Sequence, residues 1–94
     1  MAAYFIVDVT VEDQATYDEY RKLVGPTWEL YGVKCLARGA AETIEGDWQP
    51  QRLVILEFEN TEHFRRWYDS PEYSAAREIR FRASHARAVL LQGV

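Results

Sequence analysis

The sequence predicts an α+β fold, with a four-stranded antiparallel sheet and two helices on one of its faces. Its elements follow the order strand, helix, strand, strand, helix, strand. The two halves resemble each other, because in each an apolar strand leads into an acid-rich helix start. The chain has 94 residues, enough for one domain with one core. We therefore expect a single domain over residues 1–94.

The first strand is expected over residues 4–10, with a helix following it. Aromatic and β-branched side chains dominate the strand, and Thr10 is a suitable cap for the helix. Pro26 lacks a backbone donor, so we expect a kink or break near Gly25, and Gly32 suits the end of the helix. Large apolar residues recur along this helix at three- and four-residue steps: Tyr17, Tyr20, Val24, Trp28 and Tyr31.

Two further strands are expected over residues 33–40 and 52–59. The earlier strand is expected to run on through residues 43–45, and a loop through Gly46 and Pro50 would then shape a hairpin. The later strand contains a continuous apolar run, which is typical of a buried strand.

The second helical region is expected to begin at Asn60 or Thr61, either of which can cap a helix. Ser70-Pro71-Glu72 restarts the helix, because serine caps well, proline suits the first helical position and glutamate favours the first turn. This helix is expected to end near Ala83, and the last strand to cover residues 85–92. The order of elements is the split βαβ, ferredoxin-like arrangement, in which right-handed crossovers place both helices on one face.

The strands are apolar on both faces, although two helices can cover only one face. Residues 53–56 show no polar alternation, and residues 4–7 and 88–91 behave alike. The uncovered face would be a large exposed apolar patch, which soluble monomers avoid. We therefore predict a homodimer, packed sheet against sheet about a two-fold axis.

Charged residues are expected to gather at one end of this open face. We expect the first and third strands to be central, adjacent and parallel, which places Asp8 and Glu57 about one strand spacing apart, ~5 Å. The start of the fourth strand would lie beside Asp8, and the second strand beside Glu57. The predicted row is Lys34, Glu57, Asp8, Arg87 and His85.

Two interpretations of this row stay open. It can line a ligand pocket in which a carboxylate or His85 acts as an acid–base group. It can also be a set of cross-strand and inter-subunit ion pairs, which we favour because such pairs are common at interface rims. Small residues suit close helix packing, so the second strand is expected to turn Cys35, Ala37 and Gly39 toward the helices and Arg38 toward the open face.

Composition argues against several classes of partner. The net charge is −4 and the pI is about 5.1, whereas nucleic acid demands a basic face and an anionic membrane a polybasic segment. The two histidines and one cysteine show no metal-ligand spacing, and there is no glycine-rich phosphate loop, so we expect no metal and no other cofactor. A single cysteine fits a reducing compartment, and a cytoplasmic location is expected.

Several other residues are expected to be structural. His63 lies beside two arginines in the first turn of a helix, so we expect it to be solvated, and we expect Cys35 to be a small core residue. Arg80 could pair with Glu45 or Glu57. The helix aromatics either fill the core or line a ligand cavity, and their spacing favours the core. They are Tyr17, Tyr20, Trp28, Tyr31, Trp67 and Tyr68.

Several segments together resemble the family catalogued as domain of unknown function 1330, in the dimeric α/β-barrel superfamily. They are residues 4–7, 17–26, 31–32, 37–39, 45–50, 52–58 and 67–73. The chain departs from the family pattern at Val33, where a second glycine is frequent, and at Glu59, where a proline is frequent. Both positions are in expected turns. The resemblance implies a ferredoxin-like dimer and supplies no catalytic residues.

The function expected from these observations is the binding of a small, partly apolar ligand, between sheet and helices or at the dimer mouth. Arg38 and Arg87 are the expected ligand-binding residues. The resemblance to the wider superfamily implies an alternative, a cofactor-independent monooxygenase or isomerase acting on small organic acids or aromatics. In that alternative Arg38 would hold a carboxylate, and Asp8, Glu57 or His85 would move protons.

Overall fold

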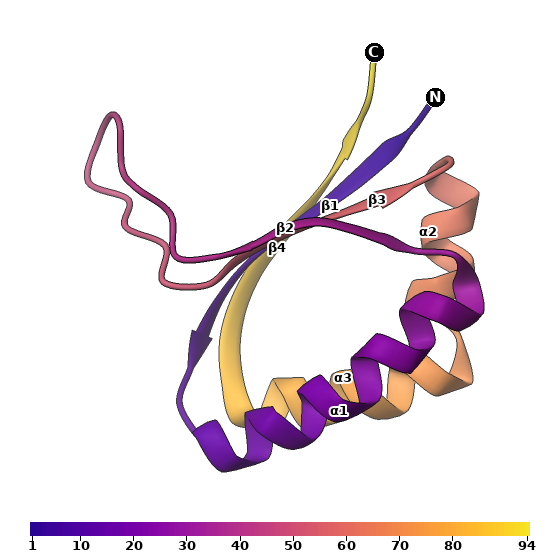
Figure 1. Cartoon of the computed structure of the whole chain (residues 1–94), viewed down its shortest axis with the longest axis horizontal. Coiled ribbons are helices and arrows are strands. Elements are labelled where there is room, and N and C mark those ends of the chain that lie inside the picture. Colours follow the sequence, from indigo (N-terminus) through magenta and orange to yellow (C-terminus); the bar gives the residue numbers. More distant parts are fainter.

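A curved antiparallel sheet arches over the helices in the structure, a computed structural model that describes residues 1–94 (Figure 1). The two long helices lie within the concave side of the sheet. The elements in chain order are β1 (Ala3–Val11), α1 (Gln14–Tyr31), β2 (Lys34–Gly39), β3 (Leu53–Phe58), α2 (Thr61–Tyr68), α3 (Pro71–Ala83) and β4 (Ser84–Gln92). This is the ferredoxin-like order that the sequence predicts.

The strands lie in the order β2-β3-β1-β4, and every neighbouring pair is antiparallel. The expectation that β1 and β3 are parallel is therefore wrong. Each helical crossover joins two parallel strands, so β1 runs parallel to β2, and the turn between β2 and β3 then makes β3 antiparallel to β1. Asp8 pairs with Leu53, and Glu57 pairs with Tyr4. The two carboxylates thus lie toward opposite ends of the central strand pair.

The predicted phase of the two central strands is confirmed. Alternate residues of β1 and β3 are buried beneath the helices, where the aromatic residues of α2 and α3 meet them. Trp67 is fully buried, stacks on Tyr73 with ring centroids 3.9 Å apart, and donates its indole N–H to the Thr27 hydroxyl at 2.9 Å. The strand residues in this core are Ala3, Phe5, Val7, Val9, Val54, Leu56 and Phe58.

Helix α1 begins later than expected. Thr10 is still paired within β1, and Asp13 caps the helix by accepting a hydrogen bond from the Thr16 N–H. The helix continues through Pro26 without a break. Gly32 ends it in the left-handed conformation at φ 68°, which glycine adopts without a Cβ penalty.

The caps predicted for α2 and α3 are confirmed at Asn60 and Ser70. His63, however, is buried and not solvated. Its Nδ1 accepts a hydrogen bond from the Glu59 N–H at 2.9 Å, and the opposite ring nitrogen therefore donates to the Tyr31 carbonyl. The imidazole joins the end of α1 to the start of α2, which explains why it lies inside.

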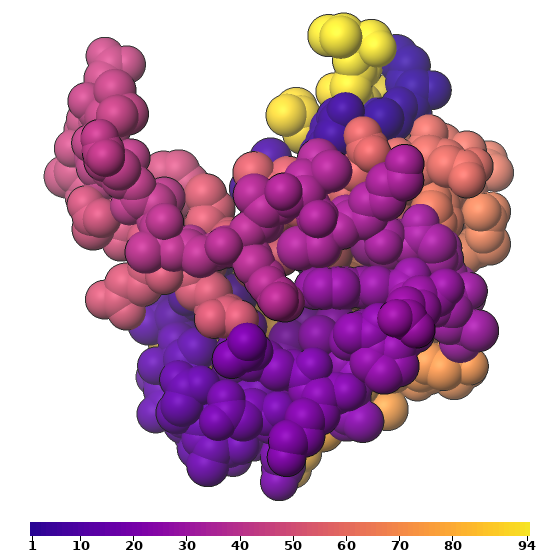
Figure 2. All heavy atoms as spheres, viewed as in Figure 1, coloured from indigo at the N-terminus to yellow at the C-terminus, as the bar shows by residue number.

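Strand β2 ends at Gly39, so the expected extension through residues 43–45 is wrong. Residues 40–52 instead form a long arm that projects from the sheet (Figures 1 and 2). One backbone hydrogen bond, from Ala41 N–H to the Pro50 carbonyl, lies within the arm, and another joins its end to β1, from Val9 N–H to the Arg52 carbonyl. The arm is tied to the sheet by Trp48, whose indole N–H donates to the Asp8 carboxylate at 2.9 Å.

A register shift between Cys35 and Ala37 changes the phase of β2. Beyond this irregularity Arg38 pairs with Val54, whose side chain is buried beneath the helices, so Arg38 lies on the helix side and not on the open face. Cys35 is exposed and is not a core residue. An extra residue in an edge strand reverses the direction of every side chain that follows it.

Candidate ligand-binding site

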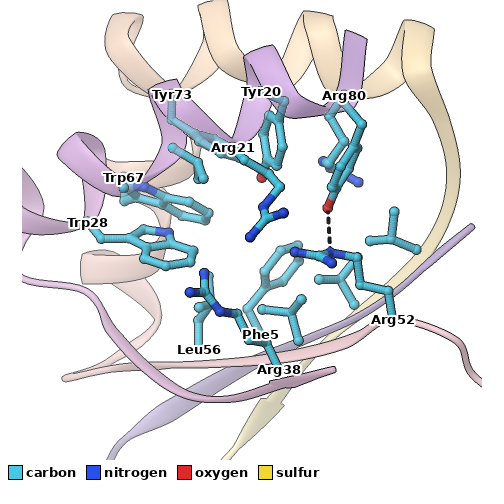
Figure 3. Close-up of a pocket in the computed structure, with 16 residues that line it drawn as sticks. Phe5, Tyr20, Arg21, Trp28, Arg38, Arg52, Leu56, Trp67, Tyr73 and Arg80 are labelled. Carbon is cyan, nitrogen blue, oxygen red and sulfur yellow. Dashed lines mark hydrogen bonds between the residues drawn. The ribbon is translucent and has the colours of Figure 1, made fainter. Parts of the chain in front are cut away.

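A cavity opens between the sheet and helices α1 and α3 (Figure 3). It leaves about 60 Å³ for the centres of water-sized molecules, within an envelope of about 570 Å³ that includes its mouth. The centre of a single water needs roughly 10–15 Å³, so the cavity has room for several waters or a small organic molecule. Of its 16 lining residues 11 are hydrophobic, contributed mainly by β1, β3 and α1. The walls therefore favour a ligand with an apolar body.

Four arginines line this cavity, and no aspartate or glutamate does. Arg21 comes from α1 and Arg38 from β2, and both are exposed and extend toward the cavity (Figure 3). Both also line an adjoining outer groove, so they stand at the mouth. Arg52 lies to one side, where its Nε donates to the Tyr17 hydroxyl at 3.1 Å. None of the four makes an ion pair with a carboxylate.

Arg80 is the innermost of these arginines and is only 4% exposed. Its Nε has no hydrogen-bond partner, so the expected pairing with Glu45 or Glu57 does not form. The stem of the residue follows the buried stripe of α3, whose members are Tyr73, Ala76, Arg80 and Ala83. This i, i+3, i+7, i+10 spacing was visible in the sequence and would have placed Arg80 inside.

Two buried phenols accompany Arg80. The Tyr20 and Tyr73 hydroxyls are 3.1 Å apart and share one hydrogen bond. Burial raises the pKa of Tyr20 well above its usual value and also raises that of Tyr73. Both are therefore neutral at physiological pH, so neither supplies a negative charge to the guanidinium beside it.

A second buried donor at the cavity is also without a partner. Trp28 lines the cavity, and its indole N–H is buried and makes no hydrogen bond. Buried donors in native proteins are nearly always satisfied, and one without a protein acceptor indicates water or a ligand at that point. Together with Arg80, this side chain presents unused donors to the same space.

The charged row predicted on the open face is divided between two ends of the sheet. At one end Arg87 lies 3.4 Å from the Asp8 carboxylate, and His85 lies 3.1 Å from Glu12. At the other end Glu57 pairs across the strands with Lys34. Asp8 and Arg87 line a wide, open groove beside the arm at residues 40–52, apart from the arginine-lined cavity.

Sequence reasoning placed Arg38 among the ligand-binding residues but missed Arg21, Arg52 and Arg80. Nothing in the local sequence marks Arg21 or Arg52, because their meeting depends on how α1 crosses the sheet. No group of histidine, cysteine, aspartate or glutamate side chains is arranged to hold a metal ion. No helix has the length and apolar character needed to cross a membrane.

The fold and the cavity define the class of protein, a ferredoxin-like α+β domain with an arginine-lined cavity beneath its sheet. The chain belongs to the family described as "Domain of unknown function (DUF1330)", whose profile matches residues 2–94. A comparison with curated proteins finds no match.

Solved structures share the fold at low sequence identity. A Rhodopseudomonas palustris protein of unknown function superposes with a TM-score of 0.80 at 18% identity, covering 99% of this chain and 82% of that one. A dimeric ferredoxin-like protein of unknown function from Jannaschia sp. CCS1 gives 0.75 at 14% identity, covering 99% and 100%. SnoaB, a cofactor-independent oxygenase from Streptomyces nogalater, gives 0.66 at 15% identity, covering 99% and 93%. At these identities the likeness shows the fold alone.

Proposed function

We propose that this protein is a homodimer that binds a small, partly apolar ligand in the cavity between the sheet and α1. The cavity itself carries the proposal, because it combines mostly hydrophobic walls with a few converging polar groups. Arg38 is the ligand-binding residue from β2. The second residue expected from the sequence, Arg87, lies in the open groove with Asp8 and would contact a ligand only there.

A thermal-shift screen against small metabolites tests ligand binding, since a ligand at 100 times its Kd stabilises the native state by about 2.7 kcal/mol. Gly25 lines the cavity, and a Cβ at this position would meet no atom within 4 Å. We expect Gly25→Leu to abolish the shift given by any hit, because the new side chain occupies the cavity. Ala75→Leu, at an exposed site on α3, is the matched control and keeps the shift. An unchanged shift in Gly25→Leu would place the ligand elsewhere.

The open face of the sheet supports the homodimer. Ile6, Leu53 and Ile55 are only half-buried there, and Val89 and Leu91 are 61% and 56% exposed. In Figure 2 the arm at residues 40–52 and the two chain ends rise on either side of this region. A second copy related by a two-fold axis would cover the apolar residues. The Jannaschia protein, which shares the fold, is dimeric.

Light scattering tests the dimer. We expect the mass of two chains at micromolar concentration, and the mass of one chain for Ile55→Lys, which places a charge in the centre of the proposed interface. Leu30→Lys is the matched control, because Leu30 is 63% exposed on α1, on the other side of the sheet. A monomeric wild type, or equal effects of the two variants, would contradict this interface.

A second candidate function is cofactor-independent oxygenation or isomerisation of a small organic acid or aromatic. The likeness in fold to the SnoaB oxygenase favours it. Apart from the four arginines, the titratable groups at the cavity are the phenols of Tyr17, Tyr20 and Tyr73. Asp8, Glu57 and His85 do not line it. Oxygen uptake or product formation with any ligand found in the screen tests this candidate. Loss of that turnover in Gly25→Leu, with the dimer intact, would assign the chemistry to the cavity.

A further inference from the structure

We propose that the ligand is an anion, a carboxylate on a flat apolar body, bound as the counter-ion of the four arginines of the cavity. This inference rests on the proposed ligand binding and adds the charge and chemical class of the ligand. Its basis is an imbalance of charge along the walls and mouth of the cavity, which the chain does not correct with its own carboxylates.

Most basic side chains of this protein make no ion pair; Arg87 with Asp8 and His85 with Glu12 are the exceptions. What distinguishes the cavity is that its lining gathers several arginines, one of them buried. Four guanidinium groups line the cavity without any carboxylate among the 16 lining residues. Asp18 and Glu29 belong to the outer groove at the mouth, and neither forms an ion pair with an arginine.

Arg80 makes this imbalance costly. A buried charge is normally paired, because removing it from water without a partner costs several kcal/mol. The ring of Phe81, with its centroid 5.2 Å from the guanidinium carbon, offsets part of that cost as a cation–π contact. The neighbouring phenols are neutral, as their raised pKa values require, so the Tyr73 hydroxyl offers Arg80 a hydrogen-bonding dipole but no negative charge. An anion entering the cavity would supply the missing charge.

The remaining lining residues specify what carries the charge. A carboxylate accepts several hydrogen bonds, and arginine binds it in a planar fork. The unused indole N–H of Trp28 adds a further donor. The rings of Trp28 and Trp67 and the apolar side chains of Phe5 and Leu56 surround the space beside these donors (Figure 3). A bare inorganic anion would leave those apolar walls in contact with water, whereas a flat hydrocarbon or aromatic body would cover them.

A comparison of benzoate with its neutral analogue benzamide tests whether the ligand must be negatively charged. A comparison of benzoate with inorganic phosphate tests whether the ligand must have an apolar body. Binding is followed in the full-length protein by the NMR signal of the Trp28 indole N–H. We expect benzoate to bind at least tenfold more tightly than benzamide, since one charge-assisted hydrogen bond accounts for a factor of roughly ten or more. We also expect benzoate to bind more tightly than phosphate.

Two arginine variants and one control complete the test. Arg38→Gln and Arg80→Met should each weaken benzoate binding roughly tenfold or more, and leave benzamide binding nearly unchanged. Arg82→Gln, an exposed site on the same helix as Arg80, should change neither.

Equal affinities for benzoate and benzamide would overturn the charge inference while leaving cavity binding intact. Phosphate binding as tightly as benzoate would overturn the inference that the ligand carries an apolar body. Absence of any shift of the Trp28 signal with all three probes at tens of millimolar would overturn this inference, and the metabolite screen with Gly25→Leu would then decide the proposed function separately.

Discussion

The buried guanidinium of Arg80 leads to a prediction about stability without ligand. Arg80 is 4% exposed, makes no ion pair and leaves its Nε without a partner. The cost of burying such an ion is several kcal/mol, and the contact with Phe81 offsets about 0.5–2 kcal/mol of it. We therefore expect Arg80→Met to raise the free energy of unfolding by about 1–3 kcal/mol. Methionine keeps an unbranched apolar side chain, and the vacated end opens onto a cavity that already exists.

Urea unfolding at one fixed protein concentration measures this change, with Arg82→Met as the control. For a domain of this size each kcal/mol corresponds to roughly 4–8 °C in Tm. The exposed Arg82 should give a change within about 0.5 kcal/mol. Destabilisation of Arg80→Met by more than 1 kcal/mol, with an unchanged dependence on urea, would show that the guanidinium is already satisfied without a ligand. Arg80 would then need no counter-ion.

Three other predictions concern the supports of the fold. His63→Ala should lower the free energy of unfolding by about 2–4 kcal/mol in urea unfolding, because it leaves the Glu59 N–H and the Tyr31 carbonyl without their partner; a loss below 0.5 kcal/mol would contradict that role. Trp48→Phe should speed proteolytic cleavage within residues 40–52, since the arm loses its hydrogen bond to β1, while the urea midpoint changes little. Asp13→Ala should be less stable than wild type at pH 7. Hydrogen bonds from the Thr16 side chain and backbone lower the pKa of Asp13 from its usual value, so the stabilisation is complete above the usual value and is lost as the pH falls through the lower, folded value. Urea midpoints of the variant and the wild type should converge below the folded value, and a constant difference would refute this assignment.

The element order and most caps could be predicted from the sequence because they depend on local chemistry. Ser70 followed by Pro71 marks a helix start wherever it occurs, and the alternation through Phe5, Val7 and Val9 places that face inward in any packed sheet. Thr10 was the wrong cap because its pairing across β1 and β4 is a long-range contact that outweighs local preference.

The candidate site depended on a register shift that local sequence patterns do not show. The register shift in β2 turned Arg38 from the open face to the cavity, and no residue type in Cys35-Leu36-Ala37 marks it. The prediction that β1 and β3 are parallel was wrong for a different reason, because the predicted order of elements already requires these two strands to be antiparallel. Only the assumed parallel direction placed Asp8 and Glu57 side by side, and the structure separates them.

Composition and periodicity alone led to a one-domain ferredoxin-like protein with an apolar open face, because hydrophobic burial and capping act over a few neighbouring residues. Only the tertiary structure brought Arg21, Arg38, Arg52 and Arg80 to one cavity, from two helices, one strand and the end of the arm. These residues are up to 59 positions apart, from 21 to 80 in the chain, and a charge cluster of this kind has no sequence spacing of its own. The cluster indicates an anion site because no carboxylate lies among the cavity residues, and which residues line the cavity is decided only by the folded chain.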